Sequence, residues 1–264
     1  MSCRCGSAGC SGDDTFPRAD LQRFYNVQRK RSAGRCGVCA DFDEVCRCAQ
    51  EKDVTLPFGI QKKQFVSERI PLDARNTWIR KDTSPERRAQ IEKLNNILAT
   101  VMPQDVYTLK PFALPVDLKR ITSSFGNRRV FVYADKKTST SMHYGIDYGV
   151  PTGTPVKVCA EGKVVLAENR ISTGWSVVIE HLPGLCSLYY HLDSFGVNEG
   201  QYVKQGEQIG VSGATGLATG SHLHWEVRLN MEAVNPEFLF ESVCVLTLMS
   251  CHASSENLCT FLSV

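Results

Sequence analysis

The spacing of hydrophobic residues changes along the chain and predicts different elements in its two halves. Residues 64–72 alternate weakly between apolar and polar side chains, which is the pattern of a strand. Residues 83–86 then combine a hydroxyl side chain, a proline and an acidic residue, the signature of a helix start. Apolar residues follow at helical spacing, so we expect an amphipathic helix over residues 85–101.

After residue 121 the apolar runs are short and are interrupted by glycine, proline, asparagine and aspartate. Such spacing is typical of antiparallel strands in a sandwich or barrel. The expected strands cover residues 156–158, 162–166, 176–179, 187–190, 208–211 and 223–229. Two stretches resemble each other, residues 153–164 and 200–210, and indicate a repeated hairpin. The predicted fold class is mainly β, a small antiparallel barrel or sandwich preceded by a strand-plus-helix segment.

These patterns divide the chain into four expected parts. Residues 1–52 form a cysteine-rich extension without a sustained period, and we expect it to be poorly ordered. Residues 53–113 hold the strand, the helix and a proline-punctuated linker, and residues 114–240 hold the β-rich domain. Residues 241–264 form a cysteine-bearing tail.

The cysteines are concentrated at the two ends of the chain. Of 12 cysteines, seven lie in the first 50 residues and three lie in the last 21. The spacing of Cys36, Cys39, Cys46 and Cys48 leaves three interpretations open: a small zinc site, disulfide-bonded loops, or no site. The start of the chain lacks the charged and apolar regions of a secretory signal.

Composition excludes some function classes. Charged residues make up 22% of the chain and nearly balance, with a formal net charge of +2, so there is no basic excess to favour nucleic acid as a partner. Apolar residues make up 42%, but no apolar run reaches the roughly 18 residues that a membrane-spanning helix needs.

The candidate chemistry begins with the last expected strand. A period of two places four side chains on an apolar face: Leu223, Trp225, Val227 and Leu229. The opposite face carries His222, His224, Glu226 and Arg228. Imidazole nitrogen is a good ligand for zinc, and Glu226 on the same face is a candidate for orienting a histidine.

Two further elements add to this face. His143 and Asp147 lie four residues apart at an expected loop-to-strand junction, and His191 ends an apolar strand. Two histidines and one carboxylate are the ligands of an open zinc site, in which the pKa of a bound water falls to about 7. Two remaining histidines would handle the protons and the oxyanion.

Together these motifs resemble the lysostaphin/LytM-type zinc endopeptidases of bacterial cell walls. The resemblance rests on the spaced motifs 121–128, 143–147, 189–192, 200–210 and 219–224, in that order. It covers residues 114–240, about half of the chain. It implies a β-barrel with a duplicated hairpin and one Zn²⁺ ion.

The resemblance also implies a role for each site residue. His143, Asp147 and His224 would be the metal ligands, and His191 and His222 the unliganded catalytic pair. The implied activity is hydrolysis of peptidoglycan stem or cross-bridge peptides, in the periplasm, the cell envelope or outside the cell. Two alternatives remain: a non-catalytic regulator of other cell-wall hydrolases on the same fold, and a zinc peptidase acting on a protein substrate.

Other positions have simpler interpretations. An insertion at residues 130–142 is expected to be a tolerated surface loop, with a loop over the groove as the alternative. His181 at an expected turn is interpreted as structural, and His252 in the tail as inert. Tyr189 is expected to pack in the barrel.

Overall fold

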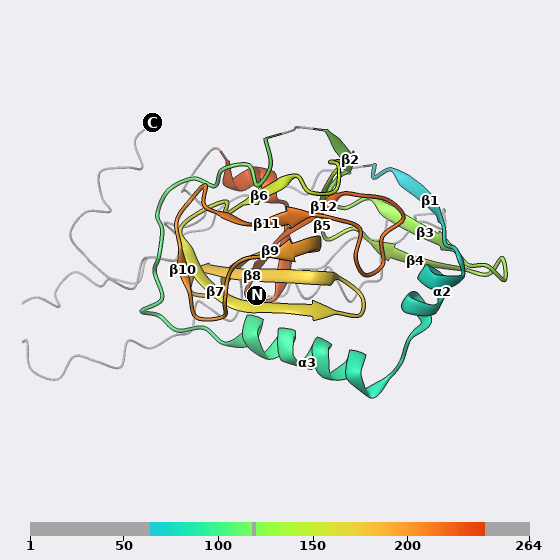
Figure 1. Ribbon diagram of the computed structural model, residues 1–264, viewed down its shortest axis with the longest axis horizontal. Coiled ribbons are helices and arrows are strands. Elements are labelled where there is room, and N and C mark those ends of the chain that lie inside the picture. Colours follow the sequence, from blue (N-terminus) through green and yellow to red (C-terminus); the bar gives the residue numbers. More distant parts are fainter. Residues whose placement is uncertain (1–63, 118–119, 241–264) are drawn as a thin grey trace, which may run out of the picture. The chain divides into compact units, whose positions relative to one another are not determined.

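The computed structural model describes residues 64–117 and 120–240. Figure 1 labels most of their elements, which we name as it does. In chain order they are β1 (Ser67–Pro71), α2 (Ala74–Lys81), α3 (Pro85–Ala99), β2 (Ile121–Ser123), β3 (Arg128–Val132), β4 (Thr138–Met142), β5 (Gly145–Tyr148), β6 (Pro155–Lys157), β7 (Gly162–Arg170), β8 (Gly174–Leu182), β9 (Leu185–Phe195), β10 (Tyr202–Val203), β11 (Gln208–Ser212), β12 (Leu223–Leu229), β13 (Glu232–Val234) and the 3₁₀ helix η2 (Pro236–Leu239).

Most described strands belong to one antiparallel sheet with the order β10-β7-β8-β9-β12-β5-β2. The two stretches that resemble each other in sequence pair with one another, because β6 pairs with β11 and β7 pairs with β10. The predicted mainly β fold with a repeated hairpin is therefore confirmed. All six expected strands are present, and most extend further than the apolar runs indicated.

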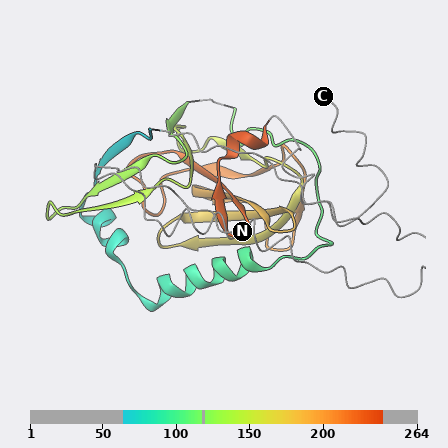
Figure 2. The ribbon, with the colours of Figure 1, turned by 180° about the vertical axis from the view of Figure 1, so that it is seen from behind.

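The sheet has a core on each face. One core is built from inward-facing side chains of the strands, among them Ile146, Leu192 and Trp225, all nearly inaccessible to solvent. The other core lies beneath α3, whose Leu98 packs with Leu188. Figures 1 and 2 show α3 running along β7 and β8 from opposite views. Burial of such apolar surface is the main contribution to stability.

The predicted start of α3 is confirmed. The Ser84 hydroxyl accepts a hydrogen bond from the backbone N–H of Arg87 at 3.2 Å, and Pro85 occupies the first helical position, where no N–H is needed. The short helix α2 was not predicted, although Asp73 caps it by accepting from the N–H of Asn76 at 2.7 Å. Asn76 then anchors α2 to the β-domain by donating from Nδ2 to the carbonyl of Ala218.

The expectation for residues 130–142 was wrong. They form most of the β3–β4 hairpin, and β3 also pairs in parallel with β1, which makes a separate three-stranded sheet. Phe131 is buried in this sheet, and the Arg80 guanidinium lies 4.5 Å from the centre of its ring. Because residues 130–142 pair with an upstream strand and bury an aromatic ring, they are part of the fold and not a tolerated surface loop.

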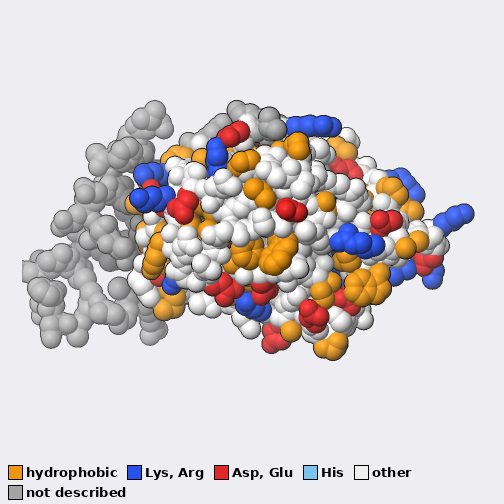
Figure 3. Space-filling model, in the orientation of Figure 1, with side chains coloured by type: hydrophobic (Ala, Val, Ile, Leu, Met, Phe, Trp, Pro, Cys, Tyr) orange, Lys and Arg blue, Asp and Glu red, His pale blue; other side chains and the backbone are white. Residues whose placement is uncertain are grey.

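The expectations for the cysteine-rich extension, the tail and His252 concern residues outside the described ranges. Within those ranges, Cys159 and Cys186 are buried free thiols. No helix in the described part is both long and apolar enough to cross a membrane. In Figure 3, acidic and basic side chains are interspersed on the visible face.

His181 lies near the end of β8, and the structure places it in the core, where it is fully inaccessible to solvent. Its Nδ1 lies 2.8 Å from the carbonyl of Glu161, and its Nε2 lies 2.7 Å from the Ser187 hydroxyl. That hydroxyl also contacts the phenol of Tyr189, which is fully buried as expected. Burial lowers the pKa of His181 to about 4, so the folded protein keeps this imidazole neutral.

This shift predicts acid sensitivity. Between pH 6.5 and about 4, the unfolded chain binds a proton at His181 that the folded protein does not bind. The free energy of unfolding that depends on the neutral His181 is therefore complete above pH 6.5 and falls as the pH drops through this window, by roughly 3 kcal/mol in all. Urea unfolding at several pH values should show a steeper loss for the wild type than for His181→Gln. If the free energy of unfolding fell equally with pH in the two proteins, His181 would not be the source of the acid sensitivity.

Candidate active site

Strand pairing builds the centre of the site. In the antiparallel pair β5–β12, Asp147 lies directly opposite His224. His143 precedes β5 by two residues, so its side chain reaches the same place from the junction that the sequence indicated. Gly145 makes this close approach possible, because a Cβ there would lie 2.4 Å from the carbonyl oxygen of Trp225 and 2.9 Å from Nε2 of His224.

Three side-chain atoms converge here. The Nε2 atom of His143 lies 3.1 Å from Oδ1 of Asp147 and 3.1 Å from Nδ1 of His224, and the last two atoms are 2.8 Å apart. All three residues are buried, with at most 7% of each residue exposed. The three predicted ligand residues are therefore the ones that the fold brings together.

Hydrogen bonds orient both imidazoles. Nδ1 of His143 lies 2.9 Å from the carbonyl oxygen of Ser124, which can only accept, so this nitrogen carries the proton and Nε2 presents its lone pair to the centre. Nε2 of His224 lies 3.3 Å from the carboxylate of Glu226. The Arg228 guanidinium pairs with that carboxylate in turn. Tyr190 stacks on the His224 ring with centroids 5.5 Å apart.

The electrostatics favour a cation at this centre. Burial alone would raise the pKa of Asp147, but hydrogen bonds from His143 and His224 and the charge of Arg129 hold it well below its usual value. Burial would likewise lower the pKa of His224, but the carboxylates of Asp147 and Glu226 outweigh this effect and raise it to about 9. Buried carboxylates require compensating positive charge.

The remaining two predicted histidines lie beside the centre. The rings of His191 and His222 have centroids 4.8 Å apart, and Nε2 of His222 lies 3.9 Å from Oδ1 of Asp147. Nδ1 of His191 donates to the carbonyl of Thr215, and Nδ1 of His222 donates to the carbonyl of Gly220, both at 2.8 Å. The Nε2 lone pair of each ring is therefore available.

Both imidazoles are neutral near pH 7. Burial, followed by the neighbouring His222 and His224, lowers the pKa of His191 to about 3, and burial also lowers the pKa of His222. His191 has a backbone φ of 61°, a left-handed conformation that is uncommon outside glycine. Such strain is concentrated at functional sites, where the surrounding structure maintains it.

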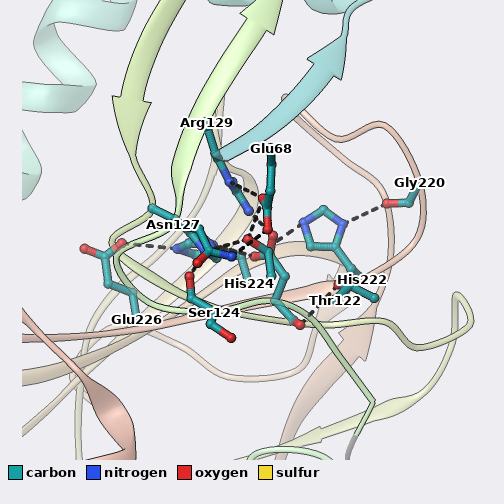
Figure 4. Close-up of polar contacts among 12 residues, drawn as sticks. Glu68, Thr122, Ser124, Asn127, Arg129, Gly220, His222, His224 and Glu226 are labelled. Carbon is teal, nitrogen blue, oxygen red and sulfur yellow. Dashed lines mark hydrogen bonds and ion pairs between the residues drawn. The ribbon is translucent and has the colours of Figure 1, made fainter. Parts of the chain in front are cut away.

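Sequence reasoning missed a polar group beside His143 and Asp147. Its members are Glu68, Ser123, Asn127 and Arg129. Figure 4 labels Glu68, Asn127 and Arg129, which lie close together. Arg129 contacts the second carboxylate oxygen of Asp147, and Ser123 Oγ lies 3.0 Å from Nδ1 of His143. The motif at residues 121–128 indicated this region but ended one residue before Arg129.

A cleft of about 270 Å³ opens beside the centre. Asp147 and His222 line it, together with Ile70 of β1 and Leu217. Because His222 lines the cleft, a substrate chain bound there would reach that imidazole.

The donor set fits a divalent transition-metal ion. Two imidazole nitrogens and one carboxylate oxygen, all within 3.1 Å of one another, are the three-residue ligand set of catalytic metal sites that keep one position open. Each imidazole is fixed by a hydrogen bond on its other nitrogen, as metal-binding histidines usually are.

Comparisons with known proteins agree with this geometry. The family model "Peptidase family M23" matches residues 141–236. The DD-carboxypeptidase/endopeptidase Mpg of Neisseria meningitidis serogroup B is 41% identical over 122 residues, and the peptidoglycan DD-endopeptidase ShyA of Vibrio cholerae is 40% identical over 122 residues. These matches cover 46% of this chain but only 27% and 28% of the relatives, so the chain spans about a quarter of their length.

A solved structure adds a fold comparison. A Pseudomonas aeruginosa crystal structure assigned to peptidase M23 is 31% identical, with a TM-score of 0.51, and the match covers 61% of this chain and 63% of that one. The motifs, the strand order and the converging side chains thus agree with the family match. The chain carries a domain of peptidase family M23, the lysostaphin/LytM type that its sequence motifs resemble.

Proposed function

We propose that this protein is a zinc-dependent endopeptidase that hydrolyses peptide bonds in peptidoglycan stem or cross-bridge peptides. The observation that carries the proposal is the convergence of His143, Asp147 and His224 beside two imidazoles with free Nε2 atoms. Relatives named as peptidoglycan endopeptidases support the substrate class. Hydrolysis of this substrate would take place in the periplasm, in the cell envelope or outside the cell.

In this proposal, His143, Asp147 and His224 hold one Zn²⁺ ion. When bound, zinc supplies Lewis acidity toward the substrate carbonyl and lowers the pKa of a coordinated water to near 7. The hydrogen bonds at Nδ1 of His143 and Nε2 of His224 keep both rings turned toward the ion.

His191 and His222 handle the protons. Each ring is held by a backbone carbonyl at Nδ1, and Nε2 of His222 lies on the side of Asp147 and the cleft. One imidazole accepts the proton of the attacking water at Nε2 and passes it to the leaving amine, which completes the cleavage and restores the neutral ring. The other, once Nε2 has taken up a proton from solvent, donates toward the oxygen that becomes negative when the carbonyl carbon turns tetrahedral.

The complete set of five residues favours an enzyme over a non-catalytic regulator on this fold, since a regulator has no use for two free imidazoles beside a metal site. The polarity and volume of the cleft also fit a protein chain, so the substrate needs a direct test.

Digestion of purified peptidoglycan sacculi tests the substrate. The zinc-loaded protein should release fragments whose masses show a new amine and a new carboxyl terminus within the stem or cross-bridge peptides. A Gly-rich protein chain, incubated in parallel, should stay intact. Cleavage of that chain with sacculi left unchanged would favour the protein-substrate alternative, and failure to cleave either substrate would contradict the enzyme.

Substitution of a ligand tests the metal site. Asp147→Asn removes the buried negative charge, so bound zinc and activity should be lost together, with activity falling at least about 10²-fold. Asp117→Asn is a matched control, because Asp117 is an exposed carboxylate whose partner is the surface residue Lys157. Zinc content by elemental analysis and sacculus digestion are the measurements. Full zinc content in Asp147→Asn would exclude this residue as a ligand.

Substitution of a free imidazole separates catalysis from metal binding. His191→Ala should retain one zinc per chain, because the ring lies outside the ligand set, and should lose about 10²–10⁴-fold in turnover. His222→Ala should behave in the same way. Turnover under saturating substrate and zinc content are measured on the same preparation. Wild-type turnover with zinc bound would remove His191 from the mechanism.

A further inference from the structure

The strand β1 lies outside the matched domain of residues 141–236 but reaches its metal centre. β1 pairs in parallel with β3, and the register sets Glu68 beside Arg129. Backbone hydrogen bonds of 2.9 Å hold both ends of this pairing, from Arg128 N to Val66 O and from Leu72 N to Val132 O. Glu68 is therefore fixed in position by the sheet.

The Glu68 carboxylate is the centre of the polar group beside the histidines. Its Oε1 accepts from Nδ2 of Asn127 at 2.6 Å, and its Oε2 accepts from the hydroxyl of Ser123 at 2.9 Å. Oε2 also lies 3.9 Å from Nε of Arg129 in an ion pair. Figure 4 shows Glu68 and Arg129 side by side above the histidines.

Arg129 lies between two carboxylates. Its guanidinium contacts Oδ2 of Asp147 on one side and faces Glu68 on the other, and its side chain is only 17% exposed. Nε of Arg129 is buried without a hydrogen-bond partner, so Arg129 and Glu68 interact through their opposite charges and not through a hydrogen bond at this atom. A cation this close to Asp147 competes with a metal ion for the same carboxylate, since the two positive charges repel each other.

We propose that Glu68 is a positioning residue of the metal centre: it offsets the charge of Arg129, so that Asp147 remains available to a divalent cation. This inference rests on the proposed function only in taking Asp147 as a ligand. Through Ser123, Glu68 also adjoins Nδ1 of His143, so it supports two of the three converging side chains. In this proposal, β1 both lines the cleft and supplies a side chain that supports metal binding.

The test is zinc affinity, measured without substrate by competition with a chromophoric chelator at fixed pH. Glu68→Gln keeps the shape and removes the charge, and it should weaken zinc binding by about 10-fold or more. Glu92→Gln, an exposed position on α3, is the matched control and should bind zinc like the wild type. Arg129→Gln removes the competing cation and should bind zinc at least as tightly as the wild type.

The double variant tests the mechanism. In the Arg129→Gln background, Glu68→Gln should cost little further affinity, because the charge that Glu68 offsets is gone. Thermal unfolding of each metal-free variant checks that the fold persists. Should Glu68→Gln unfold the protein, Arg129→Gln alone decides, since weaker zinc binding in that variant contradicts the proposal.

The outcomes are distinguishable. A wild type that binds no zinc contradicts the proposed function. A wild type that binds zinc, with unchanged affinity in Glu68→Gln, contradicts the role of Glu68 and leaves the proposed function standing. If Glu68→Gln weakens zinc binding as much in the Arg129→Gln background as in the wild type, Glu68 does not act through the guanidinium, and the inference is overturned.

Discussion

The antiparallel pairing of β5 with β12 is the constraint on which the site depends. Its register sets Asp147 opposite His224, while the adjacent pair, Ile146 and Trp225, faces the core. Because side chains alternate along a strand, a slip of one residue would turn the two polar side chains into the core and the tryptophan out of it. The hydrophobic core thus enforces the geometry of the polar site. β12 also pairs with β9, which brings in Tyr190 and His191 from the other side.

The second constraint is charge. Asp147 and Glu226 are both buried, and each contacts His224 and one arginine. Buried carboxylates are costly without compensation, so the protein holds this anionic centre together with guanidinium groups at its edges. A divalent cation bound among the three converging atoms would compensate the remaining negative charge of this centre. Rigid strands hold those atoms, and the strained backbone at His191 fixes one of the free imidazoles beside them.

Much of this was accessible from the sequence, for physical reasons. The alternation at residues 223–229 predicted both the apolar face and the polar face of β12, since side chains alternate between the two faces of a strand. The contribution of β1 was not predictable, because Glu68 is 55 residues from Ser123 and only tertiary pairing brings them together. The β3–β4 hairpin was misjudged for the same reason: its pairing partner lies far upstream, and local composition resembles that of a surface loop.

We infer that two imidazoles and a carboxylate hold one divalent ion, in a chain that also has 12 cysteines. X-ray absorption spectroscopy at the zinc edge, with one equivalent of zinc on the full chain, tests it most directly. We expect only nitrogen and oxygen neighbours at about 2.0–2.2 Å, with the scattering pattern of imidazole rings. Sulfur neighbours at about 2.3 Å would show that cysteine thiolates bind the ion and would contradict this set of ligands.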